Sequence, residues 1–442
     1  METYNKVIIM GYGKSGKAVE QVLIKEKVEY LIFDESNIPN AIHKLNKNHF
    51  KDVDLVVISP AISIFNKWVR YAKRKNIRVI SELEFGFEHL KYKPKIIAIT
   101  GTNGKTTTTK LINDIILSNG FKSVAVGNIG LPLTSVCETK YDYLVCEVSS
   151  FQLEAVDKFA PNVCVLLNVA EDHLDRHKTF KNYINSKFEL FKNKPNLSIL
   201  NFDDYITSIN TFRIEGNKTF FSKTGKCDGL FLDENDKVLN ANNKVVFDMN
   251  NLDIDKIFYD DMLATLCVCE YYKLDFTCLI DLSKKYENMT NKREILTNIS
   301  KFVIINDSKA TNIHAMQNSL KLCKTPTVLL IGGVDKKLNF DAFFNASYMY
   351  NLKAIIVYGD VKKRVLKSAK KFGFYKIVEA KKLGDAIEIG VGMLEENDTL
   401  LFSPACSSFD EFSGYEERGE FFKNKVLSLL ESKKWIRVLS II

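Results

Sequence analysis

The chain has 442 residues, 46% of them hydrophobic and 26% charged, a balance typical of a soluble globular protein with roughly two to four domains. No apolar run reaches the about eighteen residues of a membrane span, and no secretory leader is recognisable, so we expect a cytoplasmic protein. We interpret the net charge of +8 as spread along the chain, and therefore expect no nucleic-acid partner. The nine cysteines form no zinc pattern and are expected to be buried, reduced thiols.

The first ninety residues alternate short apolar runs with helix-like stretches. The runs are "KVIIMG", "EYLIFD", "DLVVISP" and "RVISE", an order typical of a parallel sheet with crossover helices. After the first run, "MGYGKSGKAVE" places glycines at positions 11, 13 and 16, and Asp34 ends the second run. This spacing is typical of a Rossmann-type nucleotide-binding turn, but alone it is a weak signal. An NAD- or FAD-dependent oxidoreductase is therefore one hypothesis.

A second series begins after a linker around Pro94. Its predicted strands are "KIIAITG", "SVAVGN", "YDYLVCEVS", "VCVLLNV" and "LSILN", with helices over 104–118 and 178–193. Short runs and turns over 210–250 indicate an antiparallel flap, and 258–287 is expected to be helical.

A third series starts near Arg293, with the predicted strands "KFVIIND", "TVLLIGG", "AIIVYG", "KIVEA" and "TLLFSP" and intervening helices. The sequence therefore predicts an α/β protein of three domains, over 1–92, 93–292 and 293–442. The first and last are expected to be Rossmann-like, and the central one to be a P-loop mononucleotide-binding domain.

The strongest local motif is "IIAITGTNGKTTTTKLIND", in which a strand runs through a glycine-rich loop into a helix. Glycines allow backbone N–H groups to surround phosphate oxygens, and the helix N-terminus adds positive potential. Lys105 is placed to reach the β- and γ-phosphates, and the Thr106 hydroxyl to ligate Mg²⁺. The loop is two residues shorter than the usual form, yet its context predicts an ATP site.

Polar residues follow several predicted strands, at the edge where open α/β sheets bind ligands. Glu147 is a candidate Mg²⁺ ligand beside the phosphate loop. His173 also follows a strand, although an isolated histidine there is most often structural, and His177 is expected to face solvent. In the third series, "IINDSKATN", "IGGVDKK" and "SPACSSFDEF" gather lysines and hydroxyls that suit a carboxylate-bearing ligand.

Taken in order, "GTNGKTTT", "EVSSFQLE", "NVAEDHLDRH", "INDSKATN", "IGGVDK" and "SPACSSFDEF" resemble the Mur ligases over essentially the whole chain. Within that family, "SSFQLE" and "NDSKATN" are most similar to the glutamate-adding members. The resemblance implies an ATP-dependent ligase of peptidoglycan precursor synthesis that joins D-glutamate to UDP-MurNAc-L-Ala through an acyl phosphate. It further implies two Mg²⁺ ions, a CO₂-derived carbamate on a lysine, and a monomer.

The resemblance also implies a role for each matching residue. Lys105, Glu147, His173 and Lys187 would be catalytic; the metals would be held by Thr106, Glu147, His173 and Lys187, the last as a carbamate. By itself Lys187 is interpreted as a helix-surface lysine. ATP would be bound by Gly101, Thr102, Asn103, Gly104, Lys105, Thr106, Thr107, Asp261, Arg293, Asp307 and Lys309. D-Glutamate would be bound by Thr311, Lys336, Ser408 and Tyr415. The UDP substrate would be bound by Gly13, Lys14, Ser15, Gly16, Asp34, Glu35, Ser59, Pro60, Ala61, Asn128, Ser149 and Gln152.

Two positions depart from the family pattern. "IFYDDMLAT" replaces a usual His-Asn-x-x-Asn stretch, so that Asp261 stands where an asparagine is expected and can accept but not donate a hydrogen bond. Tyr415 stands where phenylalanine is common. The alternatives are a family ligase that adds another amino acid, the oxidoreductase, and a nucleotide-dependent switch without catalysis. The oxidoreductase leaves the phosphate loop unexplained, and the full set of candidate catalytic residues argues against a switch.

Overall fold

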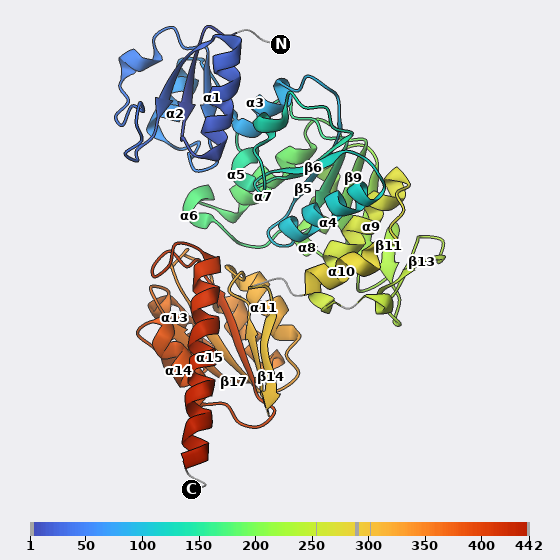
Figure 1. The fold of residues 1–442 in the computed structure, drawn as a ribbon, viewed down its shortest axis with the longest axis vertical. Helices are drawn as coiled ribbons and strands as arrows, with labels where there is room; N and C mark the ends of the chain where they lie inside the picture. Colours follow the sequence, from blue (N-terminus) through green and yellow to red (C-terminus); the bar gives the residue numbers. More distant parts are fainter. Residues whose placement is uncertain (1–3, 253, 288–290, 301, 440–442) are drawn as a thin grey trace. The chain divides into compact units, whose positions relative to one another are not determined.

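The computed structural model describes residues 4–252, 254–287, 291–300 and 302–439, and its strands form three separate sheets (Figure 1). By their contacts the residues group into two compact units: residues 1–169 with 181–283, and residues 170–180 with 284–442. The strands confirm the predicted α/β class, whereas the three domain boundaries remain a prediction.

The first sheet belongs to the first unit and has four parallel strands in the order β2-β1-β3-β4. These are β1 (Lys6–Met10), β2 (Glu29–Phe33), β3 (Leu55–Ile58) and β4 (Arg78–Ser81). Helices α1 (Lys14–Glu26) and α3 (Glu82–Glu88) pack on one face through residues such as Val19 and Phe85, and α2 (Lys67–Arg74) covers the other. All four predicted strands are confirmed.

The second sheet, in the same unit, has nine strands in the order β13-β12-β11-β10-β9-β8-β5-β7-β6. They are β5 (Lys95–Thr100), β6 (Ser123–Gly127), β7 (Tyr143–Glu147), β8 (Val163–Leu166), β9 (Leu197–Asn201), β10 (Lys218–Ser222), β11 (Gly229–Leu232), β12 (Lys237–Leu239) and β13 (Val245–Asp248). The predicted flap is antiparallel only beyond β11, because β10 pairs in parallel with both β9 and β11 and so extends the main sheet.

Helices of this part include α4 (Lys105–Ser118), which packs beside α9 (Tyr259–Tyr272). The helix predicted over 178–193 is α7 (Phe180–Phe188) followed by a 3-10 turn at Glu189–Phe191. The helical stretch predicted over 258–287 is split into α9 and α10 (Leu279–Glu287), because Lys273 adopts a left-handed conformation with φ +53° and ends α9.

The third sheet belongs to the second unit, in the order β14-β15-β19-β16-β17-β18. Its strands are β14 (Glu294–Ser300), β15 (Phe302–Asn306), β16 (Thr327–Gly332), β17 (Leu352–Tyr358), β18 (Ile377–Glu379) and β19 (Thr399–Ala405). Helices α11 (Ile313–Lys321), α12 (Asp341–Asn345) and α13 (Lys362–Lys371) cover one face; α14 (Leu383–Gly392) and α15 (Tyr415–Leu439) cover the other. The antiparallel edge strand β14 was not predicted.

The cysteines and helices agree with two further expectations. All nine cysteines are free thiols; seven are buried, and Cys278 and Cys323 are partly buried. No helix within the described residues combines the length and hydropathy needed to cross a bilayer.

Candidate active site

The loop between β5 and α4 closes on a glycine that no other residue could replace without strain. Gly104 caps α4 with φ +90°, in the left-handed region that side chains disfavour. A Cβ there would lie 2.2 Å from Asp261 Oδ1 and 3.0 Å from a methyl of Leu167. The close approach lets α4 begin beside the loop, with its first N–H groups at the carboxyl edge of the sheet.

Asn168, two residues after the end of β8, fixes the outer part of this loop and was not among the predicted site residues. Its carbonyl oxygen accepts from the Thr102 N–H at 2.9 Å, and its Oδ1 accepts from the Asn103 N–H at 2.9 Å. Its Nδ2 donates back to the Asn103 carbonyl at 3.2 Å. The signal available in the sequence was an amide side chain at the end of a strand, where it can satisfy backbone groups of a neighbouring loop.

Lys105, the first residue of α4, is folded over the loop. Its Nζ donates to the carbonyl oxygens of Gly101 at 2.7 Å and Thr102 at 2.9 Å. The side chain of Thr106 is half-buried and that of Thr107 is buried, so the first turn of α4 offers one partly accessible hydroxyl beside the lysine.

Asp261 packs against the start of α4 from α9. The side chain is 3% exposed, and its Oδ1 accepts from the Thr108 hydroxyl at 3.1 Å. The structure thus brings Asp261 to the phosphate loop, next to Gly104.

Glu147 is the last residue of β7 and lies opposite Ile99, one residue before the end of β5. Its side chain is 1% exposed. Oε1 accepts from Asn128 Nδ2 at 2.7 Å, whereas Oε2 is buried and has no hydrogen-bond partner among the residues that the structure describes. A buried carboxylate oxygen without a partner is unfavourable, and a hard cation such as Mg²⁺ would satisfy it. The residues present therefore fit a metal at this position.

Lys187 contradicts its interpretation as a surface lysine, because it is 1% exposed on α7. Its Nζ lies 4.6 Å from the ring centroid of Tyr183, one turn earlier on the same helix. The Tyr183 hydroxyl is 3.1 Å from the Thr102 hydroxyl, so α7 is tied to the phosphate loop through this contact. Periodicity placed the helix correctly but did not reveal which face is covered.

His173 belongs to the segment 170–180, which groups with the second unit. It has φ +53°, and its Nε2 lies 3.6 Å from Asp172 Oδ2. His177 is 2% exposed, so the expectation that it faces solvent was wrong; α6 (Leu174–His177) is a single turn whose last residue turns inward. The described residues contain no cluster of three or more His, Cys, Asp or Glu side chains arranged as a metal site.

Two of the residues predicted for D-glutamate meet at a buried ion pair. Lys336 is 8% exposed, and its Nζ donates to Asp172 Oδ1 at 2.9 Å and to the Thr311 carbonyl at 3.0 Å. Asn312 Nδ2 donates to the other Asp172 oxygen at 3.3 Å. Burial acts to raise the pKa of Asp172, but the charges of Lys336 and His173 outweigh burial and lower the pKa. Asp172 and Asn312 were not predicted.

Ser408 lies in the loop after β19, and Tyr415 is the first residue of α15, which follows that loop. Ser408 is 3% exposed. The carbonyl of the neighbouring Ser407 accepts from the Val334 N–H at 2.9 Å. Val334 lies two residues before Lys336, so this hydrogen bond joins the loops that carry Ser408 and Lys336. The Tyr415 carbonyl accepts from the Ser308 hydroxyl at 2.8 Å, and Lys309 Nζ is 5.7 Å from the Tyr415 ring centroid.

Arg418 holds this loop cluster together and was not predicted. It is fully buried, and its guanidinium donates to the Cys406 carbonyl at 2.9 Å and to the Ser308 carbonyl at 2.8 Å. An arginine fork joins two loops in this way because it offers several donors in a fixed plane.

Asp307 and Arg293, both predicted to bind ATP, contact each other and also form hydrogen bonds with serine residues of the same unit. Asp307 is 3% exposed and accepts from the Ser403 hydroxyl at 2.9 Å and the Arg293 N–H at 3.3 Å. Burial raises its pKa to about 6, against the lowering effect of these donors. The Arg293 guanidinium donates to the Ser319 carbonyl at 2.5 Å and the Ser319 hydroxyl at 3.0 Å.

The glycine turn after β1 packs directly on the loop after β3. Gly11 has φ +89°, and a Cβ there would lie 2.1 Å from Ser59 Oγ. The Asp34 carboxylate accepts from the N–H groups of Tyr12 at 2.7 Å and Ser36 at 2.8 Å. Partial burial acts to raise the pKa of Asp34, but these two donors outweigh it and lower the pKa. Asp34 therefore braces the turn.

The remaining residues predicted for the UDP substrate lie in the first unit. Gly13 caps α1; Lys14, Glu35 and Ala61 are exposed, Ser15 and Pro60 are half-buried, and Gly16 is buried against the Gly11 carbonyl. Ser149 and Gln152 form a capping box on α5 (Ser150–Leu153), in which Gln152 Oε1 accepts from the Ser149 N–H at 3.0 Å. The S-x-x-Q spacing would have indicated this structural use.

The comparisons with known proteins agree with the motifs. A family model described as the Mur ligase middle domain matches residues 99–256. UDP-N-acetylmuramoylalanine–D-glutamate ligases from Clostridioides difficile and Lachnoclostridium phytofermentans are 31% and 33% identical, each over 96% of this chain and 98% of the relative.

Solved structures of related enzymes share the fold. UDP-N-acetylmuramate-alanine ligase MurC from Thermotoga maritima superposes with a TM-score of 0.58 at 17% identity, covering 97% of this chain and 99% of that one. MurF ligase from Thermotoga maritima in complex with ADP superposes with a TM-score of 0.59 at 17% identity, covering 98% and 96%. With the full-length relatives above 30% identity, these likenesses show that the chain belongs to the Mur ligase family, among its UDP-N-acetylmuramoylalanine–D-glutamate ligases.

Proposed function

We propose that this chain joins D-glutamate to the free carboxylate of UDP-MurNAc-L-Ala, using ATP. The observation that carries the proposal is the phosphate loop at Gly104, beside which Glu147 holds a buried carboxylate oxygen without a partner. The full-length similarity to D-glutamate ligases supports this choice of amino acid over another.

The reaction has two steps. A carboxylate oxygen of UDP-MurNAc-L-Ala attacks the γ-phosphorus of ATP, which breaks the bond to ADP and leaves an acyl phosphate. The D-glutamate amine then attacks the acyl carbon, loses a proton, and expels inorganic phosphate as the amide forms. Phosphorylation is needed because a free carboxylate is a poor electrophile, and the anionic reactants meet only where positive charge offsets their repulsion.

Lys105 and the N–H groups of the phosphate loop bind the β- and γ-phosphates in this proposal. Lys105 Nζ now donates to two loop carbonyls, and it exchanges these for phosphate oxygens when ATP enters. Arg293, Asp307 and Lys309 are proposed as further ATP contacts, and Asp261 supports the phosphate loop by accepting from the Thr108 hydroxyl.

Glu147, Thr106, His173 and Lys187 are the proposed metal ligands. Mg²⁺ bound there would neutralise charge on the phosphates and the carboxylate that attacks them. Asn128 orients the Glu147 carboxylate by donating to Oε1, which leaves Oε2 for the metal. Lys187 would carry a carbamate, a change that turns a cationic amine into an anionic ligand; burial disfavours the charged amine and so favours this reaction.

Lys336, Thr311, Ser408 and Tyr415 are the proposed D-glutamate residues. Lys336 is held in place by Asp172, and a D-glutamate carboxylate would join or displace that partner. The glycine turn at Gly11–Gly16 and the loop at Ser59–Ala61 are proposed to bind the UDP portion. The chain is proposed to act as a cytoplasmic monomer.

Phosphate release tests the proposal. Purified protein is supplied with ATP and Mg²⁺, and phosphate is measured with UDP-MurNAc-L-Ala alone, D-glutamate alone, both, and both with D-glutamate replaced by other amino acids. Sustained release only with both substrates is expected. Release that is unchanged without D-glutamate, or equal with another amino acid, would contradict the proposed reaction.

A further inference from the structure

One short segment carries the net charge of the whole chain. Residues 362–382, "KKRVLKSAKKFGFYKIVEAKK", contain nine lysines and arginines and a single glutamate. The rest of the chain holds 53 basic and 53 acidic residues, so its formal charge is zero. The expectation that basic residues are spread along the chain was therefore wrong, because the total of +8 comes from a local excess in this segment.

Most of this charge is exposed and unpaired. Arg364 pairs with Asp335 at 2.7 Å, and Lys371 with Asp341 at 2.5 Å. The other exposed lysines have no ion pair within the part of the chain that the structure describes; they are Lys363, Lys367, Lys370, Lys376, Lys381 and Lys382. Lys363, Lys367 and Lys370 are spaced i, i+4 and i+7 on α13, so they form one row about 10 Å long. We call this row with Lys376 the basic stripe.

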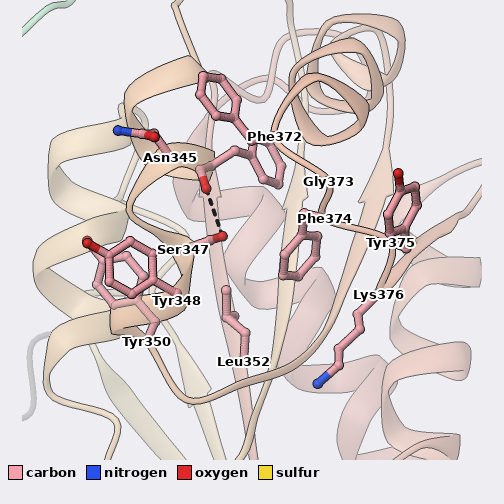
Figure 2. Close-up of a pocket in the computed structure, with 11 residues that line it drawn as sticks. Asn345, Ser347, Tyr348, Tyr350, Leu352, Phe372, Gly373, Phe374, Tyr375 and Lys376 are labelled. Atoms are coloured by element: carbon pink, nitrogen blue, oxygen red, sulfur yellow. Dashed lines mark hydrogen bonds between the residues drawn. The ribbon is translucent and has the colours of Figure 1, made fainter.

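The basic stripe leads to a hollow lined by aromatic rings. The cavity is about 600 Å³ and lies between the segment before β17 and the segment between α13 and β18. Figure 2 shows Tyr348 and Tyr350 on one side and Phe374 and Tyr375 on the other, with Lys376 next to Tyr375. Tyr348 and Tyr375 are 84% and 81% exposed. Exposed rings that gather into one patch indicate an interaction site, whereas rings exposed singly do not.

The hollow is separate from the candidate active site. It precedes β17 and β18, at the amino ends of these strands, whereas the loops with Lys336 and Ser408 follow the carboxyl ends of β16 and β19. In a parallel sheet these are opposite edges.

We infer that the basic stripe and the aromatic hollow bind single-stranded nucleic acid. Lysines in a row neutralise successive phosphates of an extended strand, and exposed tyrosine rings stack on its bases. The combination of a linear cationic stripe with open rings at its end favours a flexible polyanion that carries flat groups.

A lipid surface is a poorer match. Helices that lie on membranes bury an apolar face in the lipid, but the apolar face of α13 is already used: Val365 and Ala369 are fully buried in the domain core. Several rings also line a concave hollow, which a single base can enter but a flat bilayer cannot fill. An acidic peptide would pair with the lysines, but its carboxylates have no flat group to stack on the exposed aromatic rings.

The test is fluorescence anisotropy with labelled fifteen-residue oligo(dT) and oligo(U), each titrated with the full chain at low and moderate salt. We expect saturable binding, with a log–log salt slope of about −3 if roughly four phosphates are neutralised. Excess ATP is expected to leave the signal unchanged, which separates this site from the phosphate loop. Vesicles of phosphatidylglycerol and a polyglutamate peptide are titrated in parallel.

Variants identify the surface. Lys367→Glu with Lys370→Glu is expected to weaken oligonucleotide binding at least about tenfold, and Tyr375→Ala about tenfold through loss of a stacked base. The control, Lys51→Glu with Lys73→Glu, makes the same change in net charge at exposed positions in the first sheet's part of the chain and is expected to leave binding within about twofold. Phosphate release by each variant reports that it is folded, and glutamine at 367 and 370 replaces glutamate if the reversal unfolds the protein.

Failure of both oligonucleotides to bind at low salt would overturn the inference. So would binding that the stripe variants leave unchanged, or stronger binding of vesicles or polyglutamate that does not depend on Tyr375.

Discussion

Glu147→Gln is expected to separate activity from stability. Glutamine keeps the shape of the side chain and an oxygen to accept from Asn128 Nδ2. It removes the buried negative charge and puts a neutral N–H₂ group where the carboxylate oxygen without a partner lies. An unsatisfied buried group costs about 1–3 kcal/mol when it is neutral and more when it is charged, so the free energy of unfolding is expected to stay equal or to rise by about 1 kcal/mol. The loss of one electrostatic ligand at the reaction centre is expected to lower kcat by about 10²- to 10³-fold.

Two assays on the same preparation measure these effects. Urea unfolding gives the free energy of unfolding. An unchanged m value, the slope of that free energy against urea concentration, shows that the variant and the wild type expose the same surface on unfolding. Phosphate release with both substrates gives kcat. Asn128→Ala is the matched control: it leaves a second carboxylate oxygen unpaired, and should lower stability by about 1 kcal/mol while keeping the charge. A Glu147→Gln variant that is less stable yet retains kcat within tenfold of wild type would refute the reasoning.

Three further outcomes are expected. Lys187→Ala is expected to lose phosphate release and to regain part of it when a short carboxylic acid is added, because an external carboxylate can stand in for a carbamate; near wild-type turnover would exclude that role. Gly104→Ala is expected to lower the free energy of unfolding by about 2 kcal/mol and to weaken ATP binding, because φ +90° and the contact with Asp261 both oppose a Cβ; unchanged ATP affinity by calorimetry would contradict this. The pKa of Asp307 is raised to about 6, so its protonated form stabilises the fold at low pH and this contribution is lost as pH rises from about 4 to 6. Asp307→Asn is therefore expected to gain stability relative to wild type across that interval in thermal unfolding, and a difference that is constant with pH would count against it.

The sequence predicted the elements better than their environment. Apolar runs bounded by turns located the strands of all three sheets except the flap and β14. The strands that were located are buried on both faces and therefore appear in the sequence as continuous apolar runs. The strand β14 was missed because it is an edge strand with mixed polarity. The parallel pairing of β10 was missed because pairing direction depends on contacts between distant segments.

In the candidate site too, local motifs could be predicted from the sequence, whereas contacts between distant segments could not. The glycine-rich loop could be found from its spacing, whereas Asn168 and Arg418 act through backbone contacts that join separate loops. Lys187 was assigned to a helix surface because periodicity gives a helix but not the partner that covers its face. The capping box at Ser149 and the charge of residues 362–382 are local patterns, so the sequence alone is sufficient to predict both.

Transfer of oxygen is the most direct test of the central proposal, the acyl phosphate. UDP-MurNAc-L-Ala labelled with ¹⁸O in its free carboxylate is turned over with ATP and D-glutamate, and the released phosphate is examined by mass spectrometry. The mechanism predicts one ¹⁸O in each phosphate, because the carboxylate oxygen that attacked ATP leaves with the phosphoryl group. Phosphate without the label, formed alongside the amide product, would contradict it.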